Sequence, residues 1–468
     1  MQDFVKLLDQ ISGFVWGPPL LLLLVGTGVY LTVILGLLQF RLLPFALKQT
    51  FISHKQHDHD GDVSHFGALM TALSATIGTG NIAGVATAMV AGGPGAVFWM
   101  WVTALVGMAT KYAESLLAVK YRTTNDKGEM SGGPMYFIEL GLGRNWKWLA
   151  IAFALFGTLA SFGIGSSVQA NTVADTIYAN FGIDKWQVGV ALTLFTAVVV
   201  LGGIKSIAQA SSVIVPIMAV VYILGGIVII FQHIDLVGQA FALIISEAFT
   251  AQSVGGAVLG TAVRYGVARG LFSNEAGLGS APIAAAAAKT DHPARQALVS
   301  MTGTFLDTIV VCSITGLVLA IGYIHAGDTF GDLKGAALTT LYFNNLMPNV
   351  GGFIVSFGIV FFAYSTILGW CYYGEKCAAY LFGDKFVVVY RIIYTATVML
   401  GTVLTLDIVW TFADIFNGLM ALPNLIALLL LSKVVVSETR DFIARRKSGN
   451  CINRCKIISG SLKSFQAA

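Results

Sequence analysis

The sequence predicts an all-α polytopic membrane protein. Of its 468 residues, 56% are hydrophobic and only 11% are charged, and the mean hydropathy is +0.78. Charged residues alone make up about 25% of an ordinary soluble protein, so this composition excludes that class. The chain also divides into eleven apolar stretches, each near the length of about 20 residues that a helix needs to cross a bilayer.

The expected spans follow one another with short polar connections. We place them at residues 15–38, 66–91, 95–120, 147–178, 186–201, 211–231, 253–287, 297–325, 349–377, 387–404 and 408–432. The stretch at 253–287 is too long for one straight crossing, which predicts a break inside it. Residues 1–14 include Asp3 and Asp9 and precede no small-residue cleavage site, so we expect the first span to be retained.

The orientation follows from the lysines and arginines, which favour the inner side of a membrane. With the N-terminus outside, the outer segments hold only Lys6, Lys185 and Lys334. The inner segments then hold Arg41, Lys48, Lys55, Lys111, Lys120, Arg122, Lys127, Arg144, Lys147, Lys205, Lys289, Arg295, Lys376, Lys385, Arg391 and the basic residues from Lys433 onward. We therefore expect an outer N-terminus and a cytoplasmic C-terminus, and we read the net charge of +4 as a signal of topology rather than of nucleic-acid binding.

A glycine-rich interruption lies in the second span, in the segment Ser74–Gly84 (SATIGTGNIAG). Glycine is a poor helix former, and Asn81 brings a polar group into the bilayer. Unwound backbone is tolerated at that depth only inside protein or beside a watery cavity, where its amides can hold an anion and its carbonyls a cation. The alternative is close helix packing through small residues. The glycines at 78 and 80 lie on different helix faces, however, so we favour a binding site.

A second interruption lies in the seventh span, at Ala268–Pro282 (ARGLFSNEAGLGSAP). It combines glycine and proline with two ionisable residues, Arg269 and Glu275. Such residues are costly in a membrane unless they are paired, so the alternative to a functional role is a structural Arg269–Glu275 pair. Two spans interrupted in this way are typical of the binding site of a transporter.

Polar residues on other spans are further candidates. These are Gln169 in the fourth span, Asp307 in the eighth, and Ser365 and Thr366 in the ninth. Hydroxyls in membrane helices often bond to the carbonyl one turn earlier, which is their structural alternative. A carboxylate inside a span needs a cation, a partner or a proton, so Asp307 and Glu275 are the candidate coupling carboxylates.

Other function classes lack support. The loop His54–His65 resembles a metal site in composition, but it lacks the glycine and glutamate register of a calcium loop, and we expect a solvated loop. We interpret the five cysteines as structural thiols. His233, His292 and His325 all lie at the ends of expected spans, so no histidine lies within the membrane to act as a base, and no filter motif indicates a channel. We therefore expect no catalytic residue, no enzyme activity, no cofactor and no nucleic-acid partner; the lipid bilayer is the expected environment.

One longer motif identifies a family. The segment Gly92–Gly107 (GGPGAVFWMWVTALVG) resembles the signature of the alanine or glycine:cation symporter family, and Ala72–Gly84 and Gly270–Pro282 resemble it in the same order. The resemblance covers about residues 15–440. It implies a LeuT-type fold: a 5+5 inverted repeat at 66–231 and 253–432, preceded by one extra helix at 15–38. We expect one transporter domain over 1–448 and a cytoplasmic basic tail at 449–468.

The resemblance also implies site residues. The substrate carboxylate would meet the first break, and the pocket would be formed by Thr79, Gly80, Asn81, Gln169, Phe272, Ser273, Asn274, Thr366 and Trp370. Phe272 and Trp370 would limit the side chain of the substrate. A sodium site would use carbonyls of Ser74, Ile77 and Ala363 with the Thr366 hydroxyl; because Ile367 follows, Ser365 is a further candidate ligand.

The implied function is sodium-coupled import of alanine, glycine or both across the plasma membrane (the bacterial inner membrane) by alternating access. Sodium is then a transported ligand. The nearest alternative is a proton-coupled transporter that uses Asp307 or Glu275. The choice between alanine and glycine, the stereoselectivity, the stoichiometry and the oligomeric state stay open. Amphipathic stretches at 131–143, 236–250 and 332–346 predict interfacial helices, the last two as outer gates.

Overall fold

The computed structural model describes residues 2–52, 59–250, 260–331, 333–403 and 406–448. Within these ranges, eight continuous helical stretches are long and apolar enough to cross a membrane. The other three expected spans are the two interrupted ones and the short helix α10, Lys185–Leu201. Residues 253–259 of the seventh span and the tail at 449–468 lie outside the described residues.

Short helices and breaks separate the long helices in the first half of the chain. Its elements are α1 (Gln2–Val15), α2 (Pro18–Ile34), α3 (Leu38–Phe51), α4 (His65–Thr76), η1 (Thr79–Asn81), α5 (Ala83–Gly92), α6 (Ala96–Lys120), β1 (Thr123–Thr124), β2 (Met130–Ser131), α7 (Pro134–Leu142), η2 (Arg144–Trp146), α8 (Lys147–Ala160), η3 (Ser161–Ser167), α9 (Val168–Phe181), α10 and α11 (Gly203–Gln232). The two strands form an antiparallel hairpin.

The second half repeats this mixture of long and interrupted helices. Its elements are α12 (Ile234–Ala248), α14 (Thr261–Asn274), α15 (Ala281–Ala286), α16 (Pro293–Thr304), η4 (Phe305–Cys312), α17 (Ser313–His325), α18 (Gly335–Leu346), α19 (Gly351–Phe382), η5 (Asp384–Phe386), α20 (Val387–Val403), α21 (Leu406–Leu430) and α22 (Ser432–Lys447). η3 and η4 are wider π-type turns inside continuous helices. Such turns often occur at functional sites.

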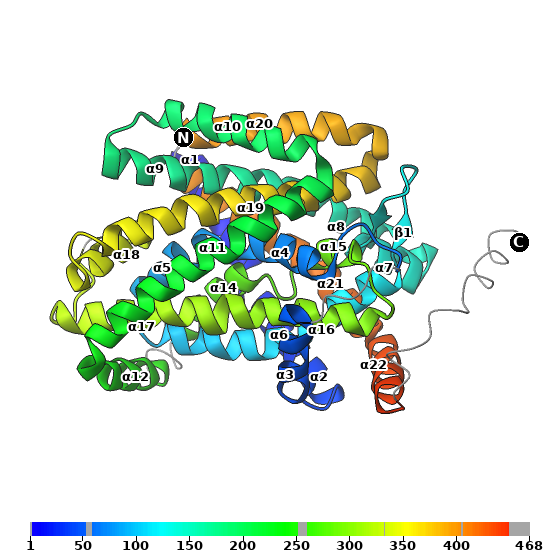
Figure 1. The fold of residues 1–468 in the computed structure, drawn as a ribbon, viewed down its shortest axis with the longest axis horizontal. Helices are drawn as coiled ribbons and strands as arrows, with labels where there is room; N and C mark the ends of the chain where they lie inside the picture. Colours follow the sequence, from blue (N-terminus) through cyan, green and yellow to red (C-terminus); the bar gives the residue numbers. More distant parts are fainter. Residues whose placement is uncertain (1, 53–58, 251–259, 332, 404–405, 449–468) are drawn as a thin grey trace, which may run out of the picture.

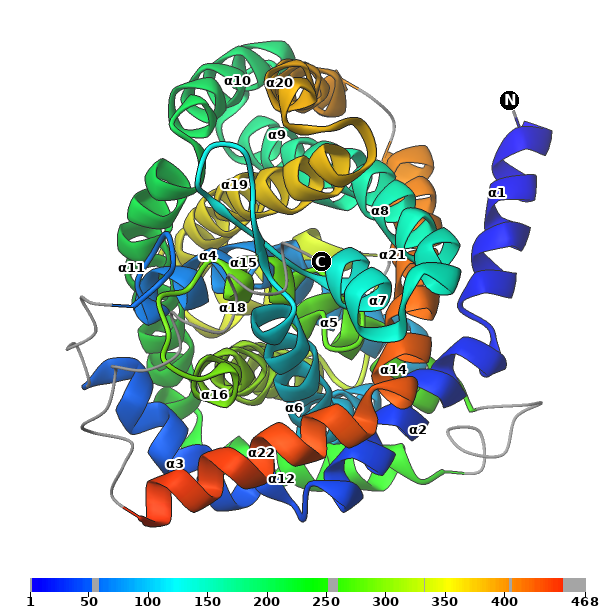
Figure 2. The ribbon, with the colours of Figure 1, turned by 90° about the vertical axis from the view of Figure 1, so that its right-hand side faces the viewer.

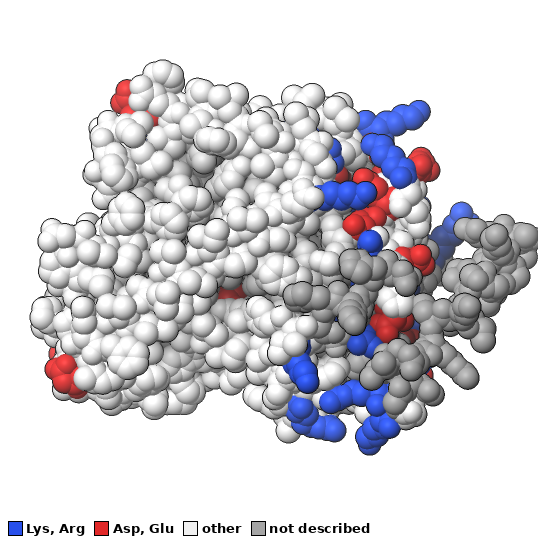
Figure 3. Space-filling view, viewed as in Figure 1, with Lys and Arg blue, Asp and Glu red and all other residues white. Residues whose placement is uncertain are grey.

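The long helices run roughly along one axis of the molecule (Figure 1). α12 and α18 lie at one end of this axis, and α7 and α22 lie at the other, where α22 runs across the end of the bundle (Figure 2). Lys and Arg side chains gather at the end with α7 and α22, which we call the charged end (Figure 3). This is the asymmetry that the sequence predicts for the inner side of the membrane.

The three amphipathic stretches form helices, as predicted: α7, α12 and α18. Helix α3 and the β1–β2 hairpin are not predicted by the sequence pattern. The basic residues from Lys433 to Lys447 lie on the helix α22, which no expected span includes. His65, expected in a solvated loop, is buried at the start of α4 and bonds to Gln296; residues 53–58 of that loop lie outside the described residues.

Two lysines do not lie where the sequence analysis places them. Lys111 and Lys376 are expected in inner loops, but they are buried within α6 and α19. The Lys376 ammonium donates to Ser131 Oγ at 3.2 Å, and Lys111 lies one turn from Glu114 on the same helix. Hydropathy alone misplaces them because it places every charged residue outside the membrane. It contains no information about the polar groups that packing brings near a buried charge.

Candidate transport site

The first break interrupts the helix between α4 and α5. α4 ends at Thr76, and η1 makes one tight turn before α5 resumes. The side chain of Asn81 folds back so that its Oδ1 accepts a hydrogen bond from Gly78 N at 2.9 Å. Thr79, Gly80 and Asn81 are all buried, so the unwound backbone lies inside protein, as the physics of the bilayer requires.

The second break separates α14 from α15. Glu275 adopts a left-handed conformation at φ 54°, and Gly277 and Gly279 have φ values of 92° and 81°. A left-handed residue other than glycine costs about 1–3 kcal/mol and persists where its surroundings hold it. Here Glu275 accepts hydrogen bonds from Trp370 Nε1 at 2.8 Å and from Ser280 Oγ at 2.6 Å. Glu275 is therefore tied to α19 and to the start of α15, and Arg269 does not pair with it.

The two breaks meet at Asp307, in the π-type turn η4. Asn81 Nδ2 donates to Asp307 Oδ1 at 2.7 Å and to Ser273 Oγ at 3.0 Å. The Ser273 hydroxyl donates to Asp307 Oδ2 at 2.7 Å, as does Thr308 Oγ1. Cys312, interpreted as a structural thiol, lies 3.3 Å from Asn81 Nδ2. The fold thus brings Asn81, Ser273 and Asp307 into one buried polar cluster.

The other predicted substrate residues lie around this cluster. Asn274 Nδ2 donates to Thr308 Oγ1 at 3.1 Å, and its Oδ1 accepts from Ala276 N at 3.0 Å. Phe272 lies against Gly80: a Cβ placed on Gly80 would be 3.2 Å from the Phe272 ring. Trp370 is buried, and its Nε1 donates to Glu275 at 2.8 Å.

The predicted sodium residues lie where α19 passes the end of α4. A Cβ placed on Gly78 would be 2.5 Å from Thr366 Oγ1 and 3.7 Å from Gln169 Oε1, so both side chains reach the first break. Ser74 is close to the same helix, since a Cβ on Gly369 would be 2.8 Å from its Oγ. The Ser365 hydroxyl instead faces α11, at 3.5 Å from Met218 Sδ. Of the two adjacent hydroxyls, Thr366 is the one beside the break.

Ile77 and Ala363 complete the predicted sodium set, and both are buried. Ile77 directly follows the last residue of α4, and Ala363 lies almost one turn before Thr366 on α19. The structure therefore places this set on two neighbouring elements.

A cavity lies beside Phe272, next to α1. It has a volume of about 230 Å³ and is lined by α1, α14 and α21, with Phe272, Arg269 and Asp414 on its wall. The Phe272 ring stacks on Trp410 with centroids 5.5 Å apart, and Arg269 pairs with Asp414 at 3.6 Å. The sequence analysis does not name Trp410 or Asp414 as site residues. Their position near the start of the last expected span could have indicated them.

A buried charge cluster on the other side of the second break is also missing from the sequence analysis. Glu114 on α6 accepts hydrogen bonds from Gly277 N at 2.5 Å and from Asn424 Nδ2 at 3.1 Å. Asn424 on α21 also donates to Gly277 O at 2.9 Å. Lys111 Nζ is fully buried with no hydrogen-bond partner among the described residues, and the charges that act on it are Glu114, Glu275 and Asp307. In the sequence, this cluster could have been recognised from Lys111 and Glu114, two opposite charges three residues apart inside an apolar span.

We expect Glu114→Ala to destabilise the protein strongly. The change removes one of the three carboxylates that act on the buried Lys111 charge and leaves Gly277 N without its acceptor, at a cost of about 3–5 kcal/mol. The measurement is the unfolding temperature of the purified protein in detergent. Glu114→Gln is the control, because it keeps an oxygen for Gly277 N and should lose less. Equal unfolding temperatures for Glu114→Ala and the unchanged protein would contradict this role.

At the charged end, the Arg122 side chain makes several hydrogen bonds to backbone carbonyls. Arg122 donates to the carbonyls of Ala286 and Ala288 at 3.0 and 2.6 Å and to that of Asp60 at 2.9 Å. The segment before α4 therefore joins the segment after α15. Asp62 accepts from Met130 N at 2.9 Å in the hairpin; burial raises its pKa, and this hydrogen bond opposes the shift.

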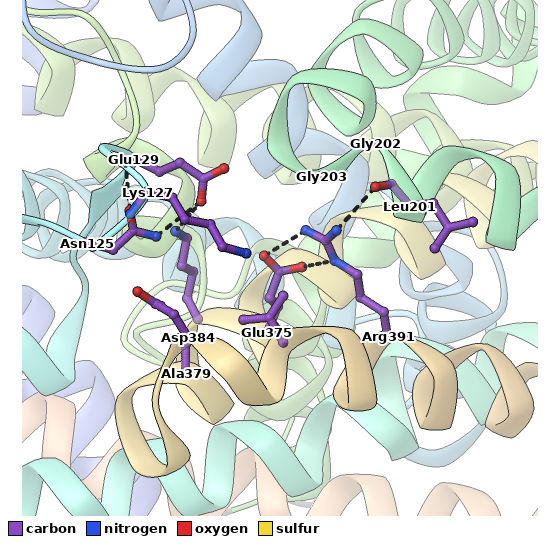
Figure 4. A pocket seen from close by; sticks show the side chains of 12 residues that line it. Asn125, Lys127, Glu129, Leu201, Gly202, Gly203, Glu375, Ala379, Asp384 and Arg391 are labelled. Atoms are coloured by element: carbon purple, nitrogen blue, oxygen red, sulfur yellow. Dashed lines mark hydrogen bonds and ion pairs between the residues drawn. The ribbon is translucent and has the colours of Figure 1, made fainter.

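A polar cavity of about 200 Å³ lies between the hairpin, the start of α11 and the end of α19 (Figure 4). Arg391 makes two hydrogen bonds to Glu375, at 2.7 and 3.0 Å, and one to the Leu201 carbonyl at 3.2 Å. Because Arg391 and Glu375 pair with each other, we interpret this cavity as a structural ion-pair site at the charged end and not as the substrate-binding site.

The chain is similar to known proteins over nearly its whole length. The model of the sodium:alanine symporter family matches residues 1–455. The chain is 60% identical to the sodium/alanine symporter AgcS of Methanococcus maripaludis, over 95% of this chain and 99% of that protein. It is 38% identical to the amino-acid carrier protein AlsT of Bacillus subtilis, over 96% and 94% of the two chains.

Among solved structures, the transporter MhsT in complex with L-phenylalanine is similar, with a TM-score of 0.59 and 15% identity over 81% of this chain and 93% of that one. This likeness confirms the predicted fold, an all-helical membrane protein of the LeuT type. Members of the matched family are transporters, so this chain is a multi-pass membrane transporter and not an enzyme. The chain belongs to the sodium:alanine symporter family.

Proposed function

We propose that this protein is a sodium-coupled symporter that imports small neutral amino acids, alanine, glycine or both, by alternating access. One observation carries the proposal beyond family membership. Gln169 Oε1 and Thr79 Oγ1 are buried beside the first break without a hydrogen-bond partner among the described residues. Unpaired buried polar atoms are costly, so they indicate a place where a polar ligand supplies the missing partner.

The chemistry of an amino acid fits these groups. The amides of Thr79 and Gly80 are suited to a carboxylate, because the end of an interrupted helix presents N–H groups and a positive dipole, whereas Asn81 N already donates to Gly78 O at 3.2 Å. Gln169 Oε1 is an acceptor suited to an ammonium group. Phe272 packs against Gly80, which limits the space for the substrate side chain and favours a methyl group or a hydrogen.

Sodium would bind between α4 and α19. The proposed ligands are the carbonyls of Ser74, Ile77 and Ala363 and the hydroxyl of Thr366, all oxygen donors of the kind that hard cations prefer. Bound sodium would neutralise these carbonyls and favour one shape of the broken helix. The amino acid would then bind more tightly to the sodium-loaded form, and the coupling is reciprocal by linkage.

Asp307 and Glu275 remain the candidate coupling carboxylates. Asp307 contacts Asn81 and Ser273, one from each break, so its charge bears directly on the shape of both. A proton on Asp307 in place of a cation is the alternative coupling mechanism. We also propose the orientation with the charged end in the cytoplasm, in the plasma membrane.

The test is uptake of labelled alanine into proteoliposomes at constant pH, with an inward sodium gradient and then with potassium in place of sodium. Uptake that depends on sodium supports the proposal. Equal uptake in both, abolished by collapse of a proton gradient, would transfer coupling to Asp307 or Glu275. Labelled glycine in the same vesicles ranks the two substrates. Absence of concentrative uptake of either amino acid by folded protein would refute the substrate assignment.

We expect Thr366→Ala to raise the sodium concentration for half-maximal uptake by about tenfold, because one lost cation ligand costs about 1.4 kcal/mol or more. The matched control is Ser365→Ala, which removes the neighbouring hydroxyl that faces Met218 rather than the break. The measurement is alanine uptake as a function of sodium concentration. If Ser365→Ala had the larger effect, the proposed sodium ligand would be wrong.

A further inference from the structure

A groove between a membrane helix and a basic surface helix lies at the charged end of the molecule. α2 ends there at Ile34, and α22 begins there at Ser432. Tyr30 and Ser432 join the two helices through a hydrogen bond of 3.2 Å between their hydroxyls. Beside this bond is a cavity of about 410 Å³, with Tyr30 and Ile34 on one wall and Lys433, Val436, Ser437 and Arg440 on the other.

The basic wall of the groove is one face of α22. Lys433, Ser437 and Arg440 are spaced i, i+4 and i+7, so the three side chains lie on the same side of the helix. In the part of the chain that the structure describes, neither cation lies within ion-pair distance of a carboxylate. The acidic residues of α22 have other partners: Glu438 pairs with Lys120, and Asp441 pairs with Arg445. The groove therefore presents two uncompensated positive charges.

The other wall belongs to the surface that faces lipid. On α2, Tyr30 is 43% exposed and Val33 is 68% exposed, and both lie in a helix apolar enough to span the membrane. The groove therefore lies beside the exposed apolar surface of α2, at the end of this helix. A free anion would be attracted by the two positive charges but would make no favourable contact with the apolar wall, whereas a lipid could contact both.

We propose that this groove binds an anionic phospholipid from the leaflet at the charged end. Lys433 and Arg440 contact the phosphodiester, and Ser437 donates a hydrogen bond to the headgroup. An acyl chain runs along Tyr30 and Ile34. Basic pockets between helices at a membrane surface are suited to such headgroups, and the guanidinium of Arg440 is suited to two phosphate oxygens at once.

The lipid would hold α22 in place. α22 is otherwise anchored on its far side, where Tyr112 of α6 and Thr439 share a hydrogen bond of 2.9 Å and His292 contacts Asp441 at 3.1 Å. Lipid in the groove adds an anchor to α2. Since α6 also carries Glu114, loss of the lipid should loosen the helix that supports the second break.

The test uses the full-length protein, phosphatidylglycerol as the probe and native mass spectrometry to count bound lipid. We expect one tightly bound phosphatidylglycerol, with phosphatidylcholine retained far less. Lys433→Ala with Arg440→Ala should weaken this binding about 30-fold, because each of the two cations contributes to the attraction of an anionic surface. The matched control removes two exposed lysines of the charged end outside the groove, Lys127→Ala with Lys385→Ala, and should leave binding unchanged.

Three results would overturn the proposal. The first is equal loss of phosphatidylglycerol in both double variants, which would indicate attraction to net charge alone. The second is displacement of the lipid by inorganic phosphate at equal concentration, which would make the groove a site for free anions. The third is unchanged binding in the groove variant. The unfolding temperature in neutral detergent, measured for both double variants, confirms that each is folded before the comparison.

Discussion

Replacing Asp307 with asparagine should reduce sodium-driven alanine uptake by about 100-fold. The carboxylate accepts hydrogen bonds from Asn81, Ser273 and Thr308 and is the charged group that joins the two breaks. Removal of its charge weakens all three bonds and any interaction with a transported cation. A loss of about 3 kcal/mol corresponds to this factor. The measurement is initial uptake rate in proteoliposomes, with protein content and unfolding temperature determined in parallel.

The control for Asp307→Asn is Asp175→Asn. This change removes the carboxylate on α9 that forms an exposed ion pair with Lys185 at the start of α10. Exposed pairs contribute little, so uptake should be unchanged. Glu275→Gln, measured beside them, tells whether the second carboxylate is equivalent. Normal uptake by folded Asp307→Asn would exclude Asp307 from coupling in either its sodium or its proton form.

Gly78→Ala should reduce uptake by about 10- to 100-fold, because overpacking of a tightly packed site costs about 1–3 kcal/mol. The added Cβ would be 2.5 Å from Thr366 Oγ1, a separation that real structures do not tolerate. Thr366 or the break must move, and both belong to the proposed sodium site. The measurement is alanine uptake over a range of sodium concentrations, with the largest change expected in the apparent affinity for sodium.

Gly84→Ala is the matched control, since no atom lies within 4 Å of a Cβ at this position in α5. This change improves helix propensity and should leave uptake unchanged or slightly stabilise the protein. If the two glycine variants transported alike, the close approach of Thr366 to the first break would have no role in transport. If both lost activity, the effect would come from the helix rather than from the site.

The two breaks could be predicted because their cause is local. Glycine and asparagine weaken a helix wherever they occur, and at bilayer depth that weakness has few tolerated outcomes. The same reasoning located Gln169, Thr366 and Asp307, since polar groups in apolar spans are conspicuous in the sequence alone. Which of these groups touch one another could not be derived this way: Asn81 and Asp307 are 226 residues apart and meet only through packing.

The charges that sequence analysis misplaced have the same explanation. Lys111 and Lys376 were assigned to loops because an unpaired charge in hydrocarbon is costly, and hydropathy contains no information about partners. The fold supplies Ser131 of a distant hairpin as the partner of Lys376, whereas Lys111 Nζ has no hydrogen-bond partner among the described residues and lies three residues from Glu114 on α6. The direction of the Ser365 hydroxyl, toward α11 and away from the break, likewise depends on how α19 is rotated against its neighbours.

By itself, then, the sequence determined the membrane class, the spans, the charge asymmetry and the two broken helices, because each depends on the cost of placing a residue in lipid. Only the tertiary structure decided the partners of Asp307 and Lys376, the choice of Thr366 over Ser365 beside the break, and the groove between α2 and α22. Those features depend on contacts between distant segments, whose free energy is set by packing geometry and not by composition.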